Sequence, residues 1–261
     1  METNSEKFAI KSLRPMKMAS SLLFFGIPSV ILWFCVYYVM QKLHQNGVND
    51  FLNFYVSMVT PLMFMLVASL VAYKVEGNRF NWPSFSKRFR LKKMTRTDWL
   101  WTIGLFILMG ILYSSLTFTS KWLIQFKLFA PPEFLLPAVD PRIEAQFFPE
   151  TFMGVPLKGQ WWIALCYFSA LLFNIFGEEF WWRGYILPRQ ELAFEKWTWV
   201  IHGLLWTLFH IFWKWNLLML LPTCLALSYV VYKRKNTWIG IITHMAFNSV
   251  PLIGLIIAII G

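Results

Sequence analysis

The stretch that decides the fold covers residues 160–187 and reads QWWIALCYFSALLFNIFGEEFWWRGYIL. Its apolar residues lie all round a helix, whereas a soluble helix would interleave polar residues at the helical period. The stretch is also longer than the roughly 20 residues that a helix needs to cross a bilayer. Residues 160–187 are therefore predicted to form a membrane-spanning helix.

The rest of the chain repeats this pattern. Of its 261 residues 57% are hydrophobic, and they include 15 Trp and 26 Phe. A soluble globular domain averages about 45–50% apolar residues. Charged residues separate the apolar segments, and no internal repeat is present, so we expect an all-α fold, a polytopic transmembrane helix bundle of seven spans. The predicted helices cover 20–40, 51–73, 98–118, 160–187, 197–213, 217–232 and 237–260.

The net charge of +11 would suggest nucleic-acid binding in a soluble protein. In a membrane protein it is explained by the excess of Lys and Arg in cytoplasmic loops. If the N-terminus is cytoplasmic, the inner segments hold 17 of the 24 basic residues, and the outer segments hold six. The sequence therefore predicts an integral protein of the plasma membrane with a cytoplasmic N-terminus, an outer C-terminus and no nucleic-acid partner. The inner basic residues are Lys7, Lys11, Arg14, Lys17, Lys74, Arg79, Lys87, Arg88, Arg90, Lys92, Lys93, Arg96, Arg189, Lys196, Lys233, Arg234 and Lys235.

The loop 74–97 holds eight of these basic residues and a single acidic one. Its principal interpretation is a determinant of membrane topology. The alternative is a surface that binds the anionic headgroups of the bilayer.

Two adjacent carboxylates lie deep inside the span 160–187. A charged side chain at the bilayer centre costs on the order of 3 kcal/mol, so Glu178, Glu179 and Arg183 form a functional hypothesis by default. Glu179 and Arg183 are four residues apart and can pair on one helix face. Glu178 points about 100° away from that face and is expected to be the chemical group of the two. The competing interpretation is a buried ion network that only fixes helix packing.

Two histidines lie in later spans, His210 in 197–213 and His244 in 237–260. His244 and Asn248 are four residues apart and share a helix face. At about 1.5 Å per residue, Glu178 lies roughly 14 Å, His210 roughly 20 Å and His244 roughly 11 Å from the cytoplasmic ends of their spans. A lone membrane histidine more often makes a helix–helix hydrogen bond. The similar depths instead predict that the three side chains meet.

The chain contains three motifs in this order: Glu178-Glu179-x-x-x-Arg183, Trp206-x-x-x-His210 and His244-x-x-x-Asn248. Together they resemble the CPBP family of CaaX prenyl-protein endopeptidases and bacteriocin-processing enzymes, also called the Abi family. The resemblance covers about residues 160–250 and implies an intramembrane endopeptidase with about eight spans. It divides the chain into N-terminal membrane helices with a basic cytoplasmic loop (1–120) and a catalytic helix core (160–260), within one membrane domain. One departure is Trp206, where the family usually has Phe.

Carried over to this chain, the resemblance implies catalytic roles for Glu178, His210, His244 and Asn248. Glu178 and His210 would activate a water, and His244 and Asn248 would stabilise the oxyanion. Glu179 and Arg183 would support the helix. The family is often described as metalloproteases, and one Glu with two His is a set that holds catalytic zinc, here Glu178, His210 and His244. The sequence lacks His-Glu-x-x-His, so the preferred mechanism uses no cofactor, with zinc as the alternative.

Two other classes of function compete with a peptidase that cleaves membrane-associated peptides or proteins. A proton-coupled transporter would also place Glu and His within the membrane. It would lose substrate flux in Glu178→Gln with no peptide cleavage to measure. A non-catalytic scaffold or bacteriocin self-immunity protein would keep its phenotype when Glu178, His210 or His244 is replaced by Ala. The substrate itself is not indicated by the sequence.

Overall fold

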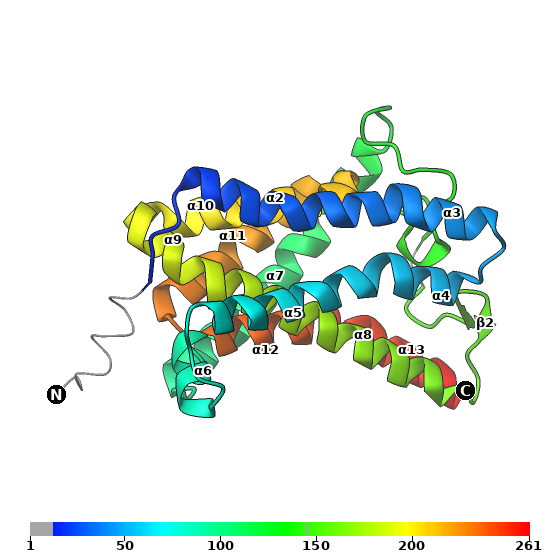
Figure 1. Ribbon diagram of the computed structural model, residues 1–261. Helices are drawn as coiled ribbons and strands as arrows, with labels where there is room; N and C mark the ends of the chain where they lie inside the picture. The colour runs from blue at the N-terminus through cyan, green and yellow to red at the C-terminus, as the bar shows by residue number, and fades with distance from the viewer. Residues whose placement is uncertain (1–12, 145) are drawn as a thin grey trace.

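The computed structural model describes residues 13–144 and 146–261, which form a bundle of long helices (Figure 1). The predicted all-α fold is confirmed, and strands among the described residues are limited to the short antiparallel hairpin β1–β2. Lys7 and Lys11 lie outside the described residues. The N-terminal elements are α2 (Met18–Phe34), η1 (Cys35–Val39), α3 (Met40–Gln45), α4 (Asp50–Phe54), η2 (Tyr55–Val59), α5 (Thr60–Val75), α6 (Trp82–Arg88), α7 (Arg96–Leu123) and η3 (Pro137–Val139).

The C-terminal half supplies most of the interior of the bundle. Its helix α10 lies between α2 and α11, and α12 packs against both α7 and α8. The elements of this half are β1 (Thr151–Phe152), β2 (Val155–Pro156), α8 (Trp161–Glu179), η4 (Phe180–Ile186), α9 (Leu187–Phe194), η5 (Glu195–Trp197), α10 (Thr198–Phe209), η6 (His210–Asn216), α11 (Leu217–Arg234), α12 (Thr237–Asn248) and α13 (Val250–Ile260).

The structure corrects several predicted helix boundaries. The segment 98–118 extends over Arg96–Leu123, because Thr95 and Asp98 form a capping box at its start. The segment 197–213 is α-helical only to Phe209 and continues as a 3-10 helix in which Trp213 leaves helical geometry. The segment 237–260 is broken near Ser249 into α12 and α13, which meet at 41°. The short helix α6 within the basic loop was not predicted.

Four helical stretches of the described chain are long and apolar enough to cross a membrane, or five if α12 and α13 count as one broken span. One of these stretches, Trp161–Arg234, has 74 residues. It folds back on itself, since its helices α10 and α11 pack side by side. The number of crossings, predicted as seven from the sequence and eight from the family resemblance, stays a prediction.

Large apolar side chains are exposed over much of the bundle, and several polar or charged side chains are buried among the apolar residues of its interior. Glu179, Arg183, Gln190, Asn53 and Ser57 are all fully buried. An exterior this apolar requires lipid rather than water around it. The chain is therefore an integral membrane protein. Among the exposed large apolar residues are Leu23, Val30, Phe64, Val67, Leu100, Ile107 and Leu165.

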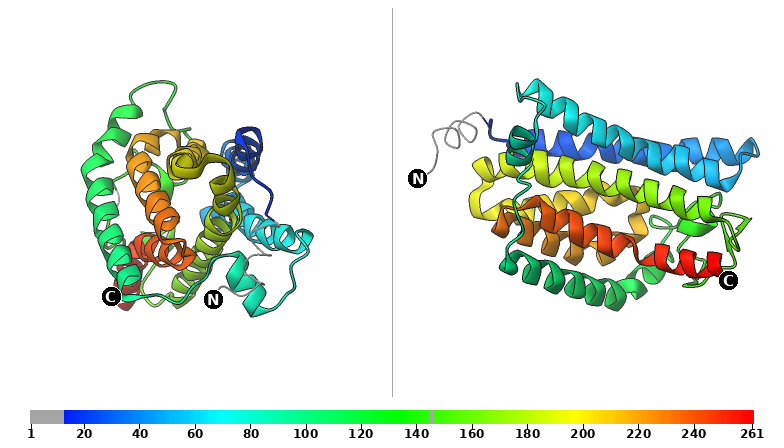
Figure 2. Two further views of the ribbon diagram at one scale, coloured as in Figure 1. Left: turned by 90° about the vertical axis from the view of Figure 1, so that its left-hand side faces the viewer. Right: turned by 90° about the horizontal axis from the view of Figure 1, so that it is seen from below.

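The basic residues gather at one end of the bundle, and the chain terminates at the other. Figure 1 shows α6 and α9 at the end where the described chain begins, while α3, α4, β2 and the C-terminus lie at the opposite end. We call these the basic end and the hairpin end. Figure 2 shows α7 on one flank, where it packs against α11 and α12. The helices that carry the motifs therefore contact helices from both halves, and the predicted division near residue 120 remains a prediction.

Candidate active site

The predicted site residues come from three elements that meet in the middle of the bundle. Glu178 and Glu179 end α8, and Arg183 follows in the π-helical segment η4. Single π-helical turns often occur at functional sites. His210 begins η6, and His244 lies in α12. Gly177 lets α8 approach α5 closely, because a Cβ there would lie 2.6 Å from the Leu62 carbonyl oxygen.

The carboxylate of Glu178 is held by three N–H donors. Its Oε2 accepts from Trp206 Nε1 at 2.8 Å and from Trp182 Nε1 at 3.3 Å, and its Oε1 accepts from Asn174 Nδ2 at 3.2 Å. A carboxylate oxygen offers about two lone-pair positions. The two indoles therefore occupy Oε2, whereas Oε1 keeps one position for a further partner. As helical geometry predicts, Arg183 pairs with Glu179 rather than with Glu178, whose partners are neutral N–H groups.

Glu179 forms the ionic centre of the site. Its Oε1 accepts from Arg183 Nη1 at 2.9 Å and from His244 Nδ1 at 3.0 Å, and both Glu179 and Arg183 are fully buried. The predicted Glu179–Arg183 pair is thus present. The guanidinium carbon of Arg183 also lies 3.5 Å from the ring centroid of Trp206, a cation–π contact. The contact of His244 with Glu179 was not predicted, and it leaves only Nε2 of that ring for a substrate.

His210 also lies against the ring of Trp206. Its Nδ1 is 2.8 Å from the backbone oxygen of Trp206. A carbonyl oxygen only accepts, so Nδ1 carries the proton, and the neutral ring presents the Nε2 lone pair. The ring centroids of His210 and His244 lie 5.8 Å and 5.6 Å from that of Trp206. The structure therefore brings Glu178, His210 and His244 together around one tryptophan.

Asn248 joins the site through a second asparagine. Its Nδ2 donates to Asn174 Oδ1 at 3.1 Å, and Asn174 in turn donates to Glu178. Asn248 thus holds the donor of the carboxylate, and its second N–H remains for another acceptor. Asn174 and Trp182 were not predicted, although each lies four residues from Glu178 and so on the same side of a helix. Trp206 was noted only as a departure from the usual Phe of the family.

An apolar cavity of about 550 Å³ begins at the two asparagines. Pockets of this size hold small ligands or short segments of a chain. Residues from α5, α7, α8 and α13 line it, together with Phe152 of the hairpin. The cavity wall thus contains Asn174, the donor to the Oε1 atom of Glu178. A group at this end of the cavity would contact Asn174, the donor to the less occupied oxygen of that carboxylate.

The three residues proposed for zinc do not form a metal-binding set in this structure. Among the described residues, no group of three His, Cys, Asp or Glu side chains is placed to hold a metal ion. The hydrogen bonds alone do not account for this, because Glu178 Oε1, His210 Nε2 and His244 Nε2 each keep a free position, and a carboxylate at Nδ1 is a common partner of metal-ligating histidines. Glu178, His210 and His244 meet around Trp206, but not as three ligands of one ion.

Comparison with known proteins gives one match. Residues 160–250 match the family model described as type II CAAX prenyl endopeptidase Rce1-like. On this similarity we call residues 160–250 the Rce1-like domain. No curated protein and no solved structure matches the chain. The Rce1-like domain agrees with the predicted CPBP resemblance and supports an intramembrane endopeptidase in general terms. It gives no support to bacteriocin immunity.

Gly240 makes room for the ionic centre of the Rce1-like domain. A Cβ at Gly240 would lie 2.3 Å from Glu179 Oε2 and 3.2 Å from its Cδ. Since Arg183 and His244 hold this carboxylate from the other side, Gly240→Ala is expected to lower the free energy of unfolding by about 3 kcal/mol. Unfolding in mixed detergent micelles measures the effect. Gly26→Ala is the matched control, because a Cβ there meets nothing within 4 Å. Equal stability of the two variants would contradict the close contact.

Trp206 differs from the usual family residue, and its indole donates to Glu178. Trp206→Phe removes this N–H but keeps a ring beneath Arg183. We expect peptide cleavage to fall by about tenfold, because a hydrogen bond to a charged group is lost. The control is Trp33→Phe, at a tryptophan that is 46% exposed on α2. The rate of peptide cleavage by the purified variants measures this effect. An unchanged rate in Trp206→Phe would show that the indole N–H is dispensable.

Proposed function

We propose that this protein is an intramembrane endopeptidase in which Glu178 and His210 activate a water molecule without a cofactor. The observation that carries the proposal is the asymmetry of the Glu178 carboxylate. Two indoles saturate Oε2, while Oε1 has a single donor, Asn174, whose side chain lines the apolar cavity. A general base needs one oxygen within hydrogen-bond reach of the water and a fixed orientation, and both conditions favour Oε1.

In the proposed reaction, a water binds between Glu178 Oε1 and His210 Nε2. Its oxygen attacks the carbonyl carbon of the scissile peptide bond while its proton passes to Glu178. The tetrahedral oxyanion accepts hydrogen bonds from the second N–H of Asn248 and from Nε2–H of His244, which carries that proton only as an imidazolium because its Nδ1–H already donates to Glu179. As the C–N bond breaks, the proton moves from Glu178 to the leaving nitrogen. Glu179 and Arg183 position His244 and the end of α8.

The zinc alternative is separated from this mechanism by a cleavage assay on the purified protein in lipid vesicles. The substrate is a quenched fluorescent peptide of apolar residues. We expect cleavage by the wild-type protein, persistence of cleavage after treatment with a strong zinc chelator, and loss of cleavage in His210→Ala. Cleavage that stops on chelation and returns on addition of zinc would overturn the metal-free mechanism. Absence of cleavage in every preparation, with a wide range of peptides, would count against the peptidase itself.

The substrate is proposed to be a peptide or protein associated with the membrane, either CaaX-like or a bacteriocin-type precursor. Support comes from the position of the site, which lies among apolar helices, and from the Rce1-like domain. We further propose that the basic end faces the cytoplasm of the cell, as the excess of Lys and Arg at that end favours.

Anionic headgroups are proposed as a second partner, at the exposed cations of loop 74–97. Part of the charge of this loop is used within the protein. Arg88 pairs with Glu76 at 2.6 Å, and Arg90 pairs with Glu191 at 2.8 Å. Lys92 and Lys93, by contrast, are exposed. Headgroup binding is therefore proposed for a smaller set of residues than the sequence suggested.

A further inference from the structure

We infer that substrate reaches Glu178 from the hairpin end of the bundle, as an uncharged apolar peptide segment that occupies the 550 Å³ cavity. The inference rests on the proposed function, and it adds the direction of entry and the chemical class of the bound segment. It is built on three features of the described residues: where the cavity runs, what closes the opposite end, and which groups line the wall.

The cavity extends from Asn174 and Asn248, which adjoin the catalytic centre, toward the hairpin end. Its inner part is lined by Asn174 and Asn248. Its outer part is lined by Phe51 at the start of α4, by Phe152 of β1 and by Pro251 at the start of α13. Figure 1 places α4, β2 and α13 together at the hairpin end. The path from that end to the donor of Glu178 Oε1 is therefore continuous.

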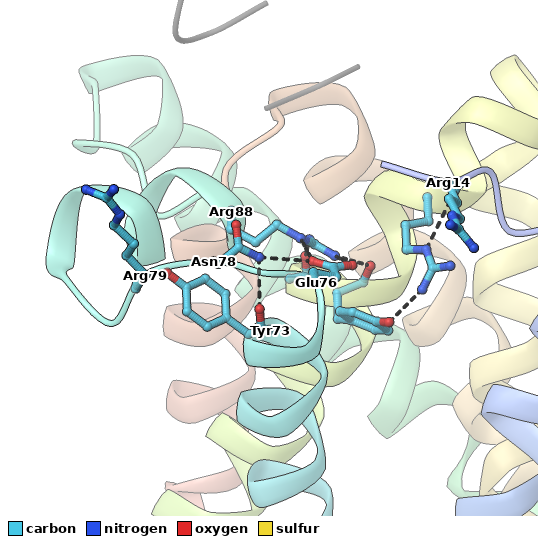
Figure 3. Close-up of polar contacts among 9 residues, drawn as sticks. Arg14, Tyr73, Glu76, Asn78, Arg79 and Arg88 are labelled. Carbon is cyan, nitrogen blue, oxygen red and sulfur yellow. Dashed lines mark hydrogen bonds and ion pairs between the residues drawn. The ribbon is translucent and has the colours of Figure 1, made fainter. Parts of the chain in front are cut away.

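The basic end is closed by chain segments that hydrogen bonds and packing hold against the core. Arg88 Nη1 donates to the Gly184 carbonyl at 2.7 Å, and its Nη2 donates to the Tyr185 carbonyl at 3.3 Å. Figure 3 shows Arg88 held against Glu76 in this network. Phe89, the next residue, is fully buried, and a Cβ at Gly184 would lie 2.1 Å from its ring. The loop after α6 thus packs directly on η4, the continuation of the helix that carries Glu178.

Two backbone hydrogen bonds complete this closure. Met16 N donates to the Arg189 carbonyl at 2.9 Å, and Thr237 N donates to the Arg90 carbonyl at 3.0 Å. Met16 is itself fully buried. The start of α2 and the loop after α6 therefore cover the basic end with ordered backbone, and entry there would require these bonds to break.

The lining of the cavity selects the class of the bound segment. None of the described residues that line it is charged, so a charged side chain within it would lose its hydration without gaining an ionic partner. Polar groups nevertheless recur along the wall, at Tyr55, Tyr113, Ser114 and Tyr167 besides the asparagines. A lipid tail cannot form hydrogen bonds with these groups, whereas a peptide backbone must satisfy its N–H and C=O groups. The wall therefore fits an apolar peptide better than a lipid chain.

With the basic end on the cytoplasmic side, the entry lies at the extracytoplasmic face. The substrate class is then an apolar segment of a peptide that is presented at the outer half of the membrane. The cleaved bond would be the one that reaches Asn174 and Asn248 at the inner end of the cavity.

Single cysteines test the direction of entry. In a background with Cys35, Cys166 and Cys224 replaced by Ala, Phe152→Cys places a thiol at the outer part of the cavity, and Ser86→Cys places one in α6 at the basic end. Each variant is compared with itself before and after reaction with a bulky maleimide, using cleavage of an apolar fluorescent peptide. We expect labelling at 152 to lower cleavage by about tenfold or more and labelling at 86 to leave it nearly unchanged. The reverse pattern, or no loss in either variant, would overturn the inference.

A binding measurement separates failure of the inference from failure of the proposed function. Glu178→Gln keeps the shape of the site, and it is mixed with a short apolar peptide that carries a benzophenone group. We expect crosslinks to Tyr113, Phe152 or Tyr167, and we expect loss of crosslinking when the peptide has a lysine at its centre. Crosslinks to residues 82–96 would overturn the direction of entry. Displacement of the peptide by a farnesyl lipid but not by unlabelled peptide would assign the cavity to a lipid chain and overturn the substrate class. These outcomes do not depend on whether the protein cleaves anything.

Discussion

Glu178→Gln is expected to lower the rate of peptide cleavage by about 10³-fold, while the protein stays folded. Glutamine has the same shape and still accepts hydrogen bonds from Trp182 and Trp206, but it cannot take a proton from water. The measurement is the cleavage rate of purified variants in lipid vesicles, together with their unfolding midpoints. The control is Glu133→Gln, at an exposed glutamate in the loop before the hairpin. A cleavage rate in Glu178→Gln that equals the control would remove Glu178 from the mechanism.

Arg183→Met is expected to lower the free energy of unfolding by about 4 kcal/mol. Arg183 is fully buried, and without it the carboxylate of Glu179 keeps His244 as its remaining partner. Breaking a buried ion pair costs more than removing both partners, because the charge left behind is uncompensated. The double variant Glu179→Gln, Arg183→Met should therefore recover at least half of the lost stability. Unfolding in detergent micelles with increasing SDS measures all three proteins.

The matched control for this pair lies at the surface. Arg142 pairs with Asp140 at 2.5 Å, but the Arg142 side chain is 39% exposed. Arg142→Met should cost less than Arg183→Met, since solvent reaches the Arg142 end of this pair, although the Asp140 side chain is only 6% exposed. If the double variant at 179 and 183 were no more stable than Arg183→Met alone, Glu179 would not be a buried charge that requires compensation.

The membrane bundle could be predicted from the sequence because its signal is local. Long apolar segments bounded by charged residues identify helices in lipid, and the observed helices fall within a few residues of the predicted ones. The break near Ser249 has a local signal as well, in Pro251 of the next helix. The π-helical segment η4 could not be predicted, because it depends on packing between segments far apart in the sequence. Arg88 illustrates this dependence, since it connects α6 to the carbonyls of η4. The short helix α6 did have a local signal, in the Asn81 cap and in Pro83 in its first turn.

The residues of the candidate site could be predicted as a set, but not their hydrogen bonds. Helical spacing predicted the pair of Glu179 with Arg183 and the common side of His244 and Asn248. Spacing cannot show which neighbour a side chain meets on another helix. His244 therefore pairs with Glu179 instead of facing the substrate with both nitrogens, and Asn248 binds Asn174. Asn174 had a signal that was overlooked, since an amide in an apolar span four residues before a glutamate is costly unless the two interact.

The central claim is that Glu178, His210 and His244 act together as one hydrolytic site within the membrane. The most direct test compares the membrane-associated peptides of cells that carry the wild-type protein with those of cells that carry Glu178→Ala, measured by mass spectrometry. We expect one longer precursor to accumulate in Glu178→Ala cells, and the same precursor to accumulate in His210→Ala and His244→Ala cells. Peptide profiles identical to wild type in all three variants, with each protein present at the wild-type level, would contradict the claim.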